Sequence, residues 1–483
     1  MAWMHNVVHL PTFREQCNKF LENGEPVNKF WLPLYYAMLS MTVYSTLPDV
    51  LLEFGIDDPQ PLYQRLHRMS IEALFAVNFM AVHSVYSVQT ICMLIHVGHN
   101  VGESDLIVTL MGSGIRIAQS LGLHRLGPDR PDLLEDIVDP QELTRKLIDR
   151  EIGKRVWWFM IRQDWLQIPF LNTYTIHASQ FNTPMPNKCP EDPRYLVQDG
   201  SVVDCNDDTY TQGSYTAVLN HVSVLIWKMQ DRMLTLGHPG QSQDGLVKLY
   251  EEVIHADSEL KKIMKHMPRF YREDGVVDSQ LPPHIAQQRQ AAMMSMAHKF
   301  FTVHRHFHVA SFRNPWFSLT KLSCLPIARR SLSSLLSLPD NEYTWIVRNM
   351  WTVNTHTVTI TVALLFDELF SPSDDTKMFD SADIETLARH CSSSLQEMCT
   401  RSEIAKKGVK ILDFLLELND AVKRGVCEEF NLEQIIAHVK GDLPRQDASQ
   451  TDPHSLDLFD DMEWPSPGIN TWESILDFIG CTD

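Results

Sequence analysis

Apolar residues recur at helical spacing along most of this chain. Between residues 74 and 86 they follow one another at intervals of three or four, which places them on one face of a helix. Strand-type alternation of apolar and polar residues is not sustained anywhere. We therefore predict an all-α protein of many packed helices. The same pattern recurs in ranges 30–43, 88–97, 106–121, 152–166, 215–236, 247–267, 287–312, 322–337, 345–370, 384–400 and 411–422.

The breaks between these ranges divide the chain. Loops are predicted where proline and acidic residues accumulate, in ranges 127–140, 184–213, 268–283 and 371–380. After residue 441 the helical period is lost and Pro, Asp, Ser and Gln increase, which is typical of disorder. We expect three parts: a helical core over 1–270, a C-terminal helical part over 271–440 packed on it, and a mostly disordered acidic tail over 441–483.

Net charge limits the partners. The chain has 483 residues, is 44% hydrophobic and carries a formal net charge of −19. An acidic chain repels the phosphate backbone, which dominates nucleic-acid affinity. Any contact with DNA is therefore expected to be indirect. The first residues lack the apolar core of a signal peptide, and no run is long and apolar enough to span a bilayer, so no membrane partner is expected.

Candidate chemistry is sparse. The nine cysteines are scattered without a C-x-x-C pair, a pattern typical of reduced thiols in an intracellular protein. Of the clustered His304, His306 and His308, only two share a helix face, which is too few for a closed zinc site. The range 112–114 (Gly-Ser-Gly) lies inside a helical pattern and lacks the rest of a nucleotide or nucleophile motif. We expect no cofactor or metal in this chain and predict that it is not an enzyme.

One set of residues forms an ordered motif. Gly122 is placed to end a helix, and Arg155 follows Glu151 by four residues, the spacing of an ion pair on a helix face. In the next loop the sequence reads Asn-Thr-Pro-x-Pro. The motif residues are Gly122, Leu123, His124, Arg125, Arg155, Trp157, Trp158, Asp164, Asn182, Pro184 and Pro186.

Together with residues 8–13, this motif resembles the middle homology region of fungal transcription factors. The resemblance covers residues 7–270 and implies a helical regulatory domain in a nuclear regulator of RNA polymerase II transcription, controlling a fungal pathway or gene cluster. The DNA-binding part of that family is normally a six-cysteine binuclear zinc cluster, which is missing here. Zinc is therefore expected only if an upstream cluster exists, and DNA contact would come from that missing N-terminal cluster or from a partner.

The resemblance also implies partners and leaves alternatives. A transcription coactivator, a DNA-binding regulator, a small-molecule effector, and a homo- or heterodimer are the candidate partners. One alternative is a helical inhibitor or cofactor protein that binds other regulators. Another is an all-α small-molecule binder or enzyme, which would need a polar constellation in a central pocket.

The acidic tail mixes carboxylates with large apolar residues, a composition typical of activation domains. Trp472 and the three apolar residues that follow it at i+3, i+4 and i+7 would give a helix one apolar stripe, suited to a coactivator groove. The alternative is a tail helix that docks on the protein's own body. The candidate partner-binding residues are Leu458, Phe459, Met462, Trp464, Trp472, Ile475, Leu476 and Ile479.

Several motif residues also have a purely structural interpretation. Trp157 and Trp158 could line a pocket, but we expect one in the core and the other at a helix–helix contact. Arg116, Arg125 and Arg155 could bind an anionic effector, but we expect them to pair with Glu151, Asp164 and helix ends. The basic range 145–155 is interrupted by acidic residues, so we expect a solvated helix face rather than an import signal.

Overall fold

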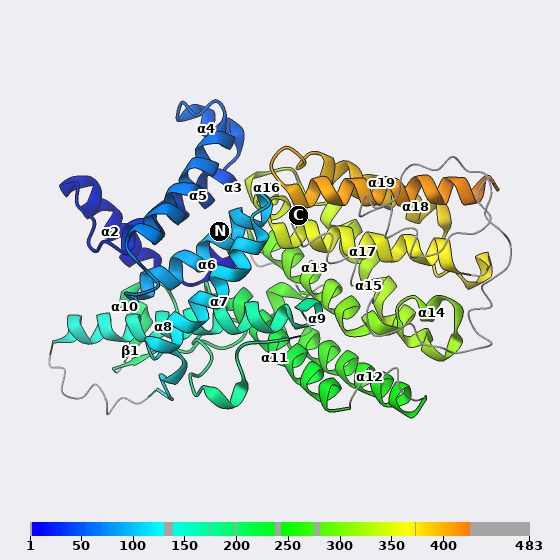
Figure 1. The fold of residues 1–483 in the computed structure, drawn as a ribbon, viewed down its shortest axis with the longest axis horizontal. Helices are drawn as coiled ribbons and strands as arrows, with labels where there is room; N and C mark the ends of the chain where they lie inside the picture. Colours follow the sequence, from blue (N-terminus) through cyan, green and yellow to red (C-terminus); the bar gives the residue numbers. More distant parts are fainter. Residues whose placement is uncertain are drawn as a thin grey trace.

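The computed structural model describes residues 2–129, 139–171, 173–198, 200–236, 243–272, 274–275, 281–371 and 373–425. Within these ranges the chain forms nineteen α-helices and a single antiparallel pair of two-residue strands (Figure 1). The prediction of an all-α fold is confirmed. The acidic tail over 441–483, with its candidate activation helix, lies outside the described residues.

The first part of the chain runs from α1 to the strand pair. In β1 and β2, Val197 pairs with Val202 and Gln198 with Ser201. The elements are α1 (Ala2–His5), α2 (Leu10–Asn23), α3 (Trp31–Ser45), α4 (Pro48–Glu53), α5 (Pro59–Ala76), α6 (Val85–Asn100), α7 (Ser104–Ser120), η1 (Leu123–Arg125), α8 (Pro140–Leu166), α9 (Ile168–Leu171), η3 (Ala178–Gln180), α10 (Pro193–Leu196), β1 (Val197–Gln198) and β2 (Ser201–Val202).

The second part is a bundle of longer helices. The α11 and α12 helices pack on each other, as do α13 with α15 and α17, and α17 with α18 and α19 (Figure 1). The elements are α11 (Ser214–Thr235), α12 (Gln243–Lys265), η5 (Arg269–Tyr271), α13 (Ile285–His304), η6 (Arg305–Phe307), α14 (Ala310–Arg313), η7 (Pro315–Phe317), α15 (Ser318–Leu336), α16 (Glu342–Arg348), α17 (Trp351–Phe370), η8 (Asp374–Thr376), α18 (Ser381–Gln396) and α19 (Glu403–Lys423).

Capping side chains fix several helix starts. Asp58 accepts a hydrogen bond from the amide of Gln60 at the start of α5, at 3.1 Å. Asp139 does the same for the amide of Gln141 in α8, at 3.0 Å. Both helices have proline in their first turn, where a missing amide hydrogen costs nothing. These caps explain why the helices begin where the polar loops end.

The helix predicted over residues 74–86 is wrong. The α5 helix ends at Ala76 and α6 begins at Val85, with turns between them. Asn78 has a φ of 55°, in the left-handed region, which is incompatible with a continuing helix. Ser84 then caps α6 by accepting from the amide of Tyr86 at 3.3 Å. The residues of this range therefore belong to the end of α5, the connecting turns and the start of α6, and their helical spacing is coincidental.

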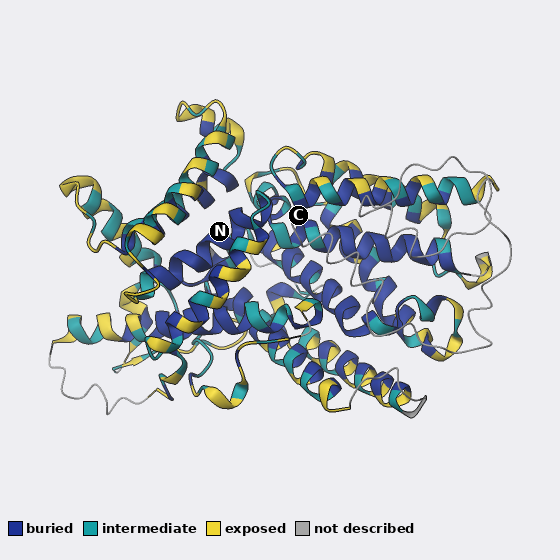
Figure 2. Cartoon of the chain, viewed as in Figure 1, coloured by how far each residue is buried: buried dark blue, intermediate teal, exposed yellow. Residues whose placement is uncertain are grey.

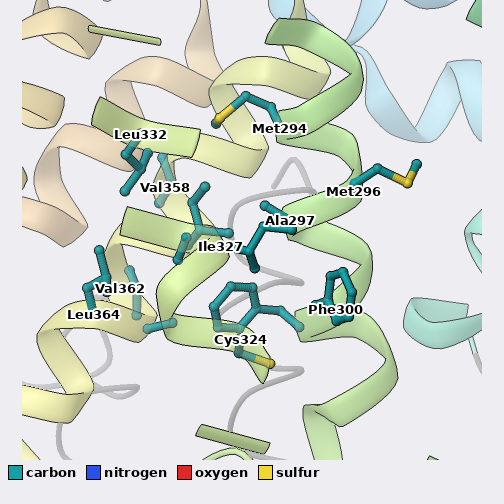
Figure 3. Close-up of a cluster of buried hydrophobic side chains, with 14 of the residues drawn as sticks. Met294, Met296, Ala297, Phe300, Cys324, Ile327, Leu332, Val358, Val362 and Leu364 are labelled. Carbon is teal, nitrogen blue, oxygen red and sulfur yellow. The ribbon is translucent and has the colours of Figure 1, made fainter. Parts of the chain in front are cut away.

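Two hydrophobic cores form among the described residues, and the buried residues lie along the inward-facing sides of the helices in both parts (Figure 2). One core joins α3, α5, α6, α7 and the middle of α8. The other joins α11 to α19, and Figure 3 shows part of it, where Cys324 of α15 lies between Phe300 of α13 and Val362 of α17 in the view. Trp3 belongs to this second core although it lies near the start of the chain. The domain boundary near residue 270 stays a prediction.

Polar and aromatic contacts join the two parts. The His99 ring of α6 lies 4.3 Å from the Trp351 ring of α17. The Arg401 guanidinium lies 4.9 Å from the ring centroids of both Tyr44 and Trp345, and 5.8 Å from that of Tyr63. Arg401 also donates a hydrogen bond to the carbonyl of Tyr44. One cation is thus surrounded by rings from α3, α5 and α16.

Gly408 permits the close approach of α19 to α17. A Cβ at this position would lie 2.3 Å from Cγ2 of Val358. Gly408→Ala is therefore expected to lower the free energy of unfolding by about 1–3 kcal/mol through overpacking. Gly112→Ala is the matched control, because Gly112 is an exposed residue of α7 and its Cβ would meet nothing within 4 Å. That change is expected to stabilise by about 0.5–1 kcal/mol. Urea midpoints that shift in the same direction would contradict the close approach.

Candidate functional site

The residues of the predicted motif converge on the middle of α8. This helix has 27 residues, and most side chains from Leu147 to Trp165 are buried. The turn after α7 and the loop after η3 both cover it. Gly122 has a φ of 77°, in the left-handed region, and its amide donates to the carbonyl of Gln119 at 3.0 Å. It therefore ends α7 as predicted and directs the chain into η1.

The loop over 181–186 pairs with the turn over 122–127. The amide of Asn182 donates to the carbonyl of His124 at 3.0 Å, and the Asn182 side chain accepts from the amide of Gly127 at 3.1 Å. The Thr183 hydroxyl donates to the carbonyl of Leu123 at 2.7 Å and accepts from the amide of Leu126 at 3.0 Å. The two segments of the motif, which lie far apart in the sequence, are thus joined by one backbone hydrogen bond and by three that involve the side chains of Asn182 and Thr183. Pro184 and Pro186 follow in irregular, partly buried backbone.

The paired tryptophans fill the space beneath this loop. Trp157 and Trp158 are both buried, and their rings lie 5.8 Å and 5.9 Å from the Phe181 ring. The Trp158 indole also donates to the carbonyl of Thr183 at 3.2 Å. Both tryptophans are core residues. A core position, expected for one of them, is found for both, and the helix–helix contact expected of the other stays a prediction.

Asp164 binds backbone rather than an arginine. Its carboxylate accepts hydrogen bonds from the amide of Thr175 at 2.9 Å and from that of Ile176 at 2.7 Å. Burial nonetheless raises the pKa of Asp164, against the effect of these bonds. Arg116 and Arg125 are exposed, and they donate to Gln119 at 3.4 Å and to the His124 ring at 3.3 Å. Of the three arginines expected to pair with Glu151, Asp164 and helix ends, only Arg155 pairs with one of these two carboxylates in the described part of the chain.

Four charged side chains of α8 are buried, and three of them, Glu151, Lys154 and Arg155, lie together. Glu151 and Lys154 each expose 1% of their surface, and Arg155 exposes 4%. The Glu151 carboxylate lies 3.1 Å from Lys154 Nζ and 3.6 Å from Arg155 Nε. The predicted ion pair between Glu151 and Arg155 is confirmed. The solvated helix face predicted over 145–155 is wrong at these positions, because loops cover the C-terminal end of that range.

Acidic loop residues balance this charge. Arg155 Nη1 lies 2.6 Å from Glu191 Oε1, and Lys154 Nζ lies 2.7 Å from Asp129 Oδ2. The Glu191 carbonyl in turn accepts a hydrogen bond at 2.8 Å from His9, one of the residues 8–13 that contribute to the family resemblance. Two distant loops are therefore fastened to one helix by charge.

Arg150 adds a third cation that organises the turn after η1. It donates to the carbonyls of Leu126, Gly127 and Pro128, each at 2.8 Å. Its Nε also lies 3.1 Å from Asp129 Oδ1. Charge-assisted bonds to successive carbonyls fix a turn that has no helical or strand bonding of its own.

The pKa directions agree with a structural role for these charges. Burial raises the pKa of Glu151, against the attraction of Arg155 and Lys154. Burial opposes the charged form of Arg155, but Glu191, Cys189 and Glu151 raise its pKa overall. Asp129, which is partly exposed, has a lowered pKa because Lys154 and Arg150 outweigh its desolvation. The network holds loops together and presents no free nucleophile or base.

Sequence reasoning missed the acidic partners. Asp129 and Glu191 lie in proline-containing loops where no periodicity marks a position as buried. One signal was present: Lys154 and Arg155 fall among apolar residues of α8, and buried cations require carboxylates from elsewhere.

The histidine cluster has structural partners. His304 is fully buried between the Thr320 hydroxyl, at 2.9 Å, and the Asp257 carboxylate, at 3.2 Å. The His308 ring packs against the rings of Phe301 and Phe312. Across the part of the chain that the structure describes, no three metal-ligating side chains gather at one point. In that same part, every helix is too short or too polar to cross a membrane.

Two curated proteins are similar to the chain. It is 23% identical over 354 residues to the agnestins biosynthesis cluster transcription factor AgnL11 of Paecilomyces divaricatus, covering 72% of this chain and 50% of that protein. It is 24% identical over 360 residues to the probable transcription factor lepB of Aspergillus flavus, covering 71% of this chain and 61% of that protein. The chain thus spans about half the length of the first and three fifths of the second. No family model matches it.

These similarities support a fungal transcription factor, as the motif resemblance implied. Both similar proteins are named for transcription, which also favours a non-enzymatic role. The extent of the middle homology region and the missing zinc cluster stay predictions.

Proposed function

We propose that this chain is the helical regulatory part of a nuclear regulator of RNA polymerase II transcription that controls a fungal pathway or gene cluster. The observation that carries the proposal is similarity to two fungal transcription factors over more than two thirds of the chain. The motif around α8 supports it, because its residues are used to fasten loops rather than to form a reactive site. Regulation by binding fits such a body better than catalysis does.

In this proposal, DNA is reached indirectly. A net charge of −19 opposes direct contact with phosphates. A separate zinc-cluster segment or a DNA-binding partner would supply the base contacts, and the helical body would receive an effector or a second subunit.

The acidic tail would recruit the transcription machinery. Carboxylates keep its aromatic side chains solvated, and the stripe of Trp472, Ile475 and Leu476 suits an apolar groove on a coactivator. The body would then set when the tail is accessible.

Tethering the chain to a heterologous DNA-binding domain upstream of a reporter tests this function. Residues 1–483 are expected to activate strongly, and a chain cut after Leu443 is expected to lose at least about tenfold, because the stripe is gone. Leu476→Ala should weaken activation, whereas Glu473→Gln, outside the stripe, should change it little. If neither chain activates while both are expressed and nuclear, the activator proposal fails and the inhibitor alternative is favoured.

A further inference from the structure

A buried polar cluster lies where α1, α6, α8 and α11 meet. We call His5, Cys92, His96, Arg162 and Asn220 the junction cluster. The His5 ring lies 6.3 Å from the His96 ring, and 5.5 Å from the Phe159 ring of α8. On α6 the cluster's two residues are four apart and share a face. All five side chains are buried.

Arg162 is the only charged member of this cluster. Its Nη1 donates to the Asn220 side-chain oxygen at 2.8 Å, and its guanidinium lies 5.0 Å from the Phe159 ring centroid. Its Nη2 has no hydrogen-bond partner, and no carboxylate from the described residues pairs with it. Burial lowers the pKa of Arg162 to about 10, so it keeps its charge at neutral pH. This differs from Arg155, which has two carboxylates.

The neighbouring side chains offer donors and no negative charge. Both ring nitrogens of His5 and of His96 are buried without a hydrogen-bond partner in the described chain. Burial lowers the pKa of both rings, so each is neutral and carries one N–H donor. Burial also raises the pKa of the Cys92 thiol, which stays uncharged.

A buried cation with unpaired donors around it demands an acceptor. Native proteins leave few buried polar atoms unpaired, and an uncompensated buried charge is costly. Water could satisfy the donors but would not neutralise the guanidinium. We propose that Arg162, with His5 and His96, binds a small monovalent anion of the size of chloride or formate. The ligand is small because the Phe159 ring, which lies 5.5 Å from the His5 ring and 5.0 Å from the Arg162 guanidinium, leaves little room between them.

Such an anion would link the two hydrophobic cores. Phe159 and Cys92 belong to the first core, whereas Trp3, two residues before His5, packs 4.8 Å from Tyr215 in the second. Binding is therefore expected to stabilise the whole chain rather than one helix.

Thermal unfolding of the full chain tests the proposal at constant ionic strength. Replacing gluconate stepwise by chloride, or by formate, is expected to raise the thermal midpoint by about 2–4 °C and then saturate. Arg162→Met should abolish this saturable rise, because the charge is lost while an apolar stem remains. Arg116→Met, an exposed arginine on α7, should retain it.

A direct binding measurement complements the unfolding series. The ³⁵Cl resonance of the wild-type solution is expected to broaden beyond that of Arg162→Met, and formate should reverse the excess. If wild type shows neither saturable stabilisation nor excess broadening, the proposal is overturned. Equal effects in wild type and Arg162→Met would overturn it as well. If the variant does not fold, broadening of the wild-type signal that formate fails to reverse decides against the site.

Discussion

Glu151→Gln is expected to lower the free energy of unfolding by about 3 kcal/mol, because it leaves each of the buried cations Lys154 and Arg155 with one carboxylate instead of two. Glu151 is 1% exposed and contacts both Lys154 and Arg155. Its carboxylate also accepts the amide of Asn187 at 2.9 Å. Glutamine keeps the shape and removes only the charge. Urea unfolding with linear extrapolation measures the change.

Glu142→Gln is the matched control on the same helix. Glu142 is 43% exposed and lies 3.4 Å from Lys146 and 4.0 Å from Arg145. Solvent screens such pairs, so this change is expected to cost less than about 1 kcal/mol. If the two variants lose similar small amounts of stability, the buried network does not hold the loops as described.

Acidification is expected to unfold the protein at about pH 3.5–4.5, because buried histidines must take up protons. Burial lowers the pKa of His5 and His308 to about 3, and of His99 to about 4. In the unfolded chain these histidines take up protons near their ordinary pKa of about 6.5. The stability that the buried neutral rings contribute is therefore complete above that pH, and it declines as the pH falls below it. Three such histidines together lower the free energy of unfolding by about 4 kcal/mol for each pH unit below about 6.5. A typical total stability of about 5–15 kcal/mol is consumed within two or three units.

Removing one such histidine makes the acid dependence shallower. His356 stacks on His298 at 4.2 Å, and burial lowers its pKa well below the usual value. For His356→Phe, the slope of unfolding free energy against pH is expected to fall by about 1.4 kcal/mol per unit between about pH 5 and 6.5. His83→Phe replaces an exposed ring and should leave the slope unchanged. Identical slopes in wild type and His356→Phe would refute the account.

Much of the helical fold could be predicted from periodicity. The ranges 88–97, 215–236 and 322–337 fall within one or two residues of α6, α11 and α15 or inside them. Long amphipathic segments bury a stripe, and that stripe is visible in the sequence. The range 345–370, in contrast, spans two helices, and at the break between them the backbone carbonyl of Asn349 accepts a hydrogen bond from the Asn100 side chain of α6 at 3.3 Å. A tertiary contact of that kind has no local signal.

The site, too, could be predicted only where local rules apply. The ends of α7 and the tryptophans of α8 follow local rules, since glycine ends helices and large apolar residues are buried. The Arg155–Glu191 pair joins positions 36 residues apart, and Arg162 becomes unusual only because no carboxylate of the described residues pairs with it. Sequence shows which groups are charged, but only the fold shows which ones meet.

Trp351 affects how cooperatively the protein unfolds. Its side chain packs against the margins of both hydrophobic cores. If either core unfolds, the Trp351 ring loses part of its packing. The other core then loses the support of that ring. A half-folded species would have to expose the indole to water, which raises its free energy. The two parts are thereby coupled into a more cooperative unit than their separate cores would suggest, so a signal that loosens one part is transmitted to the other as a change in stability.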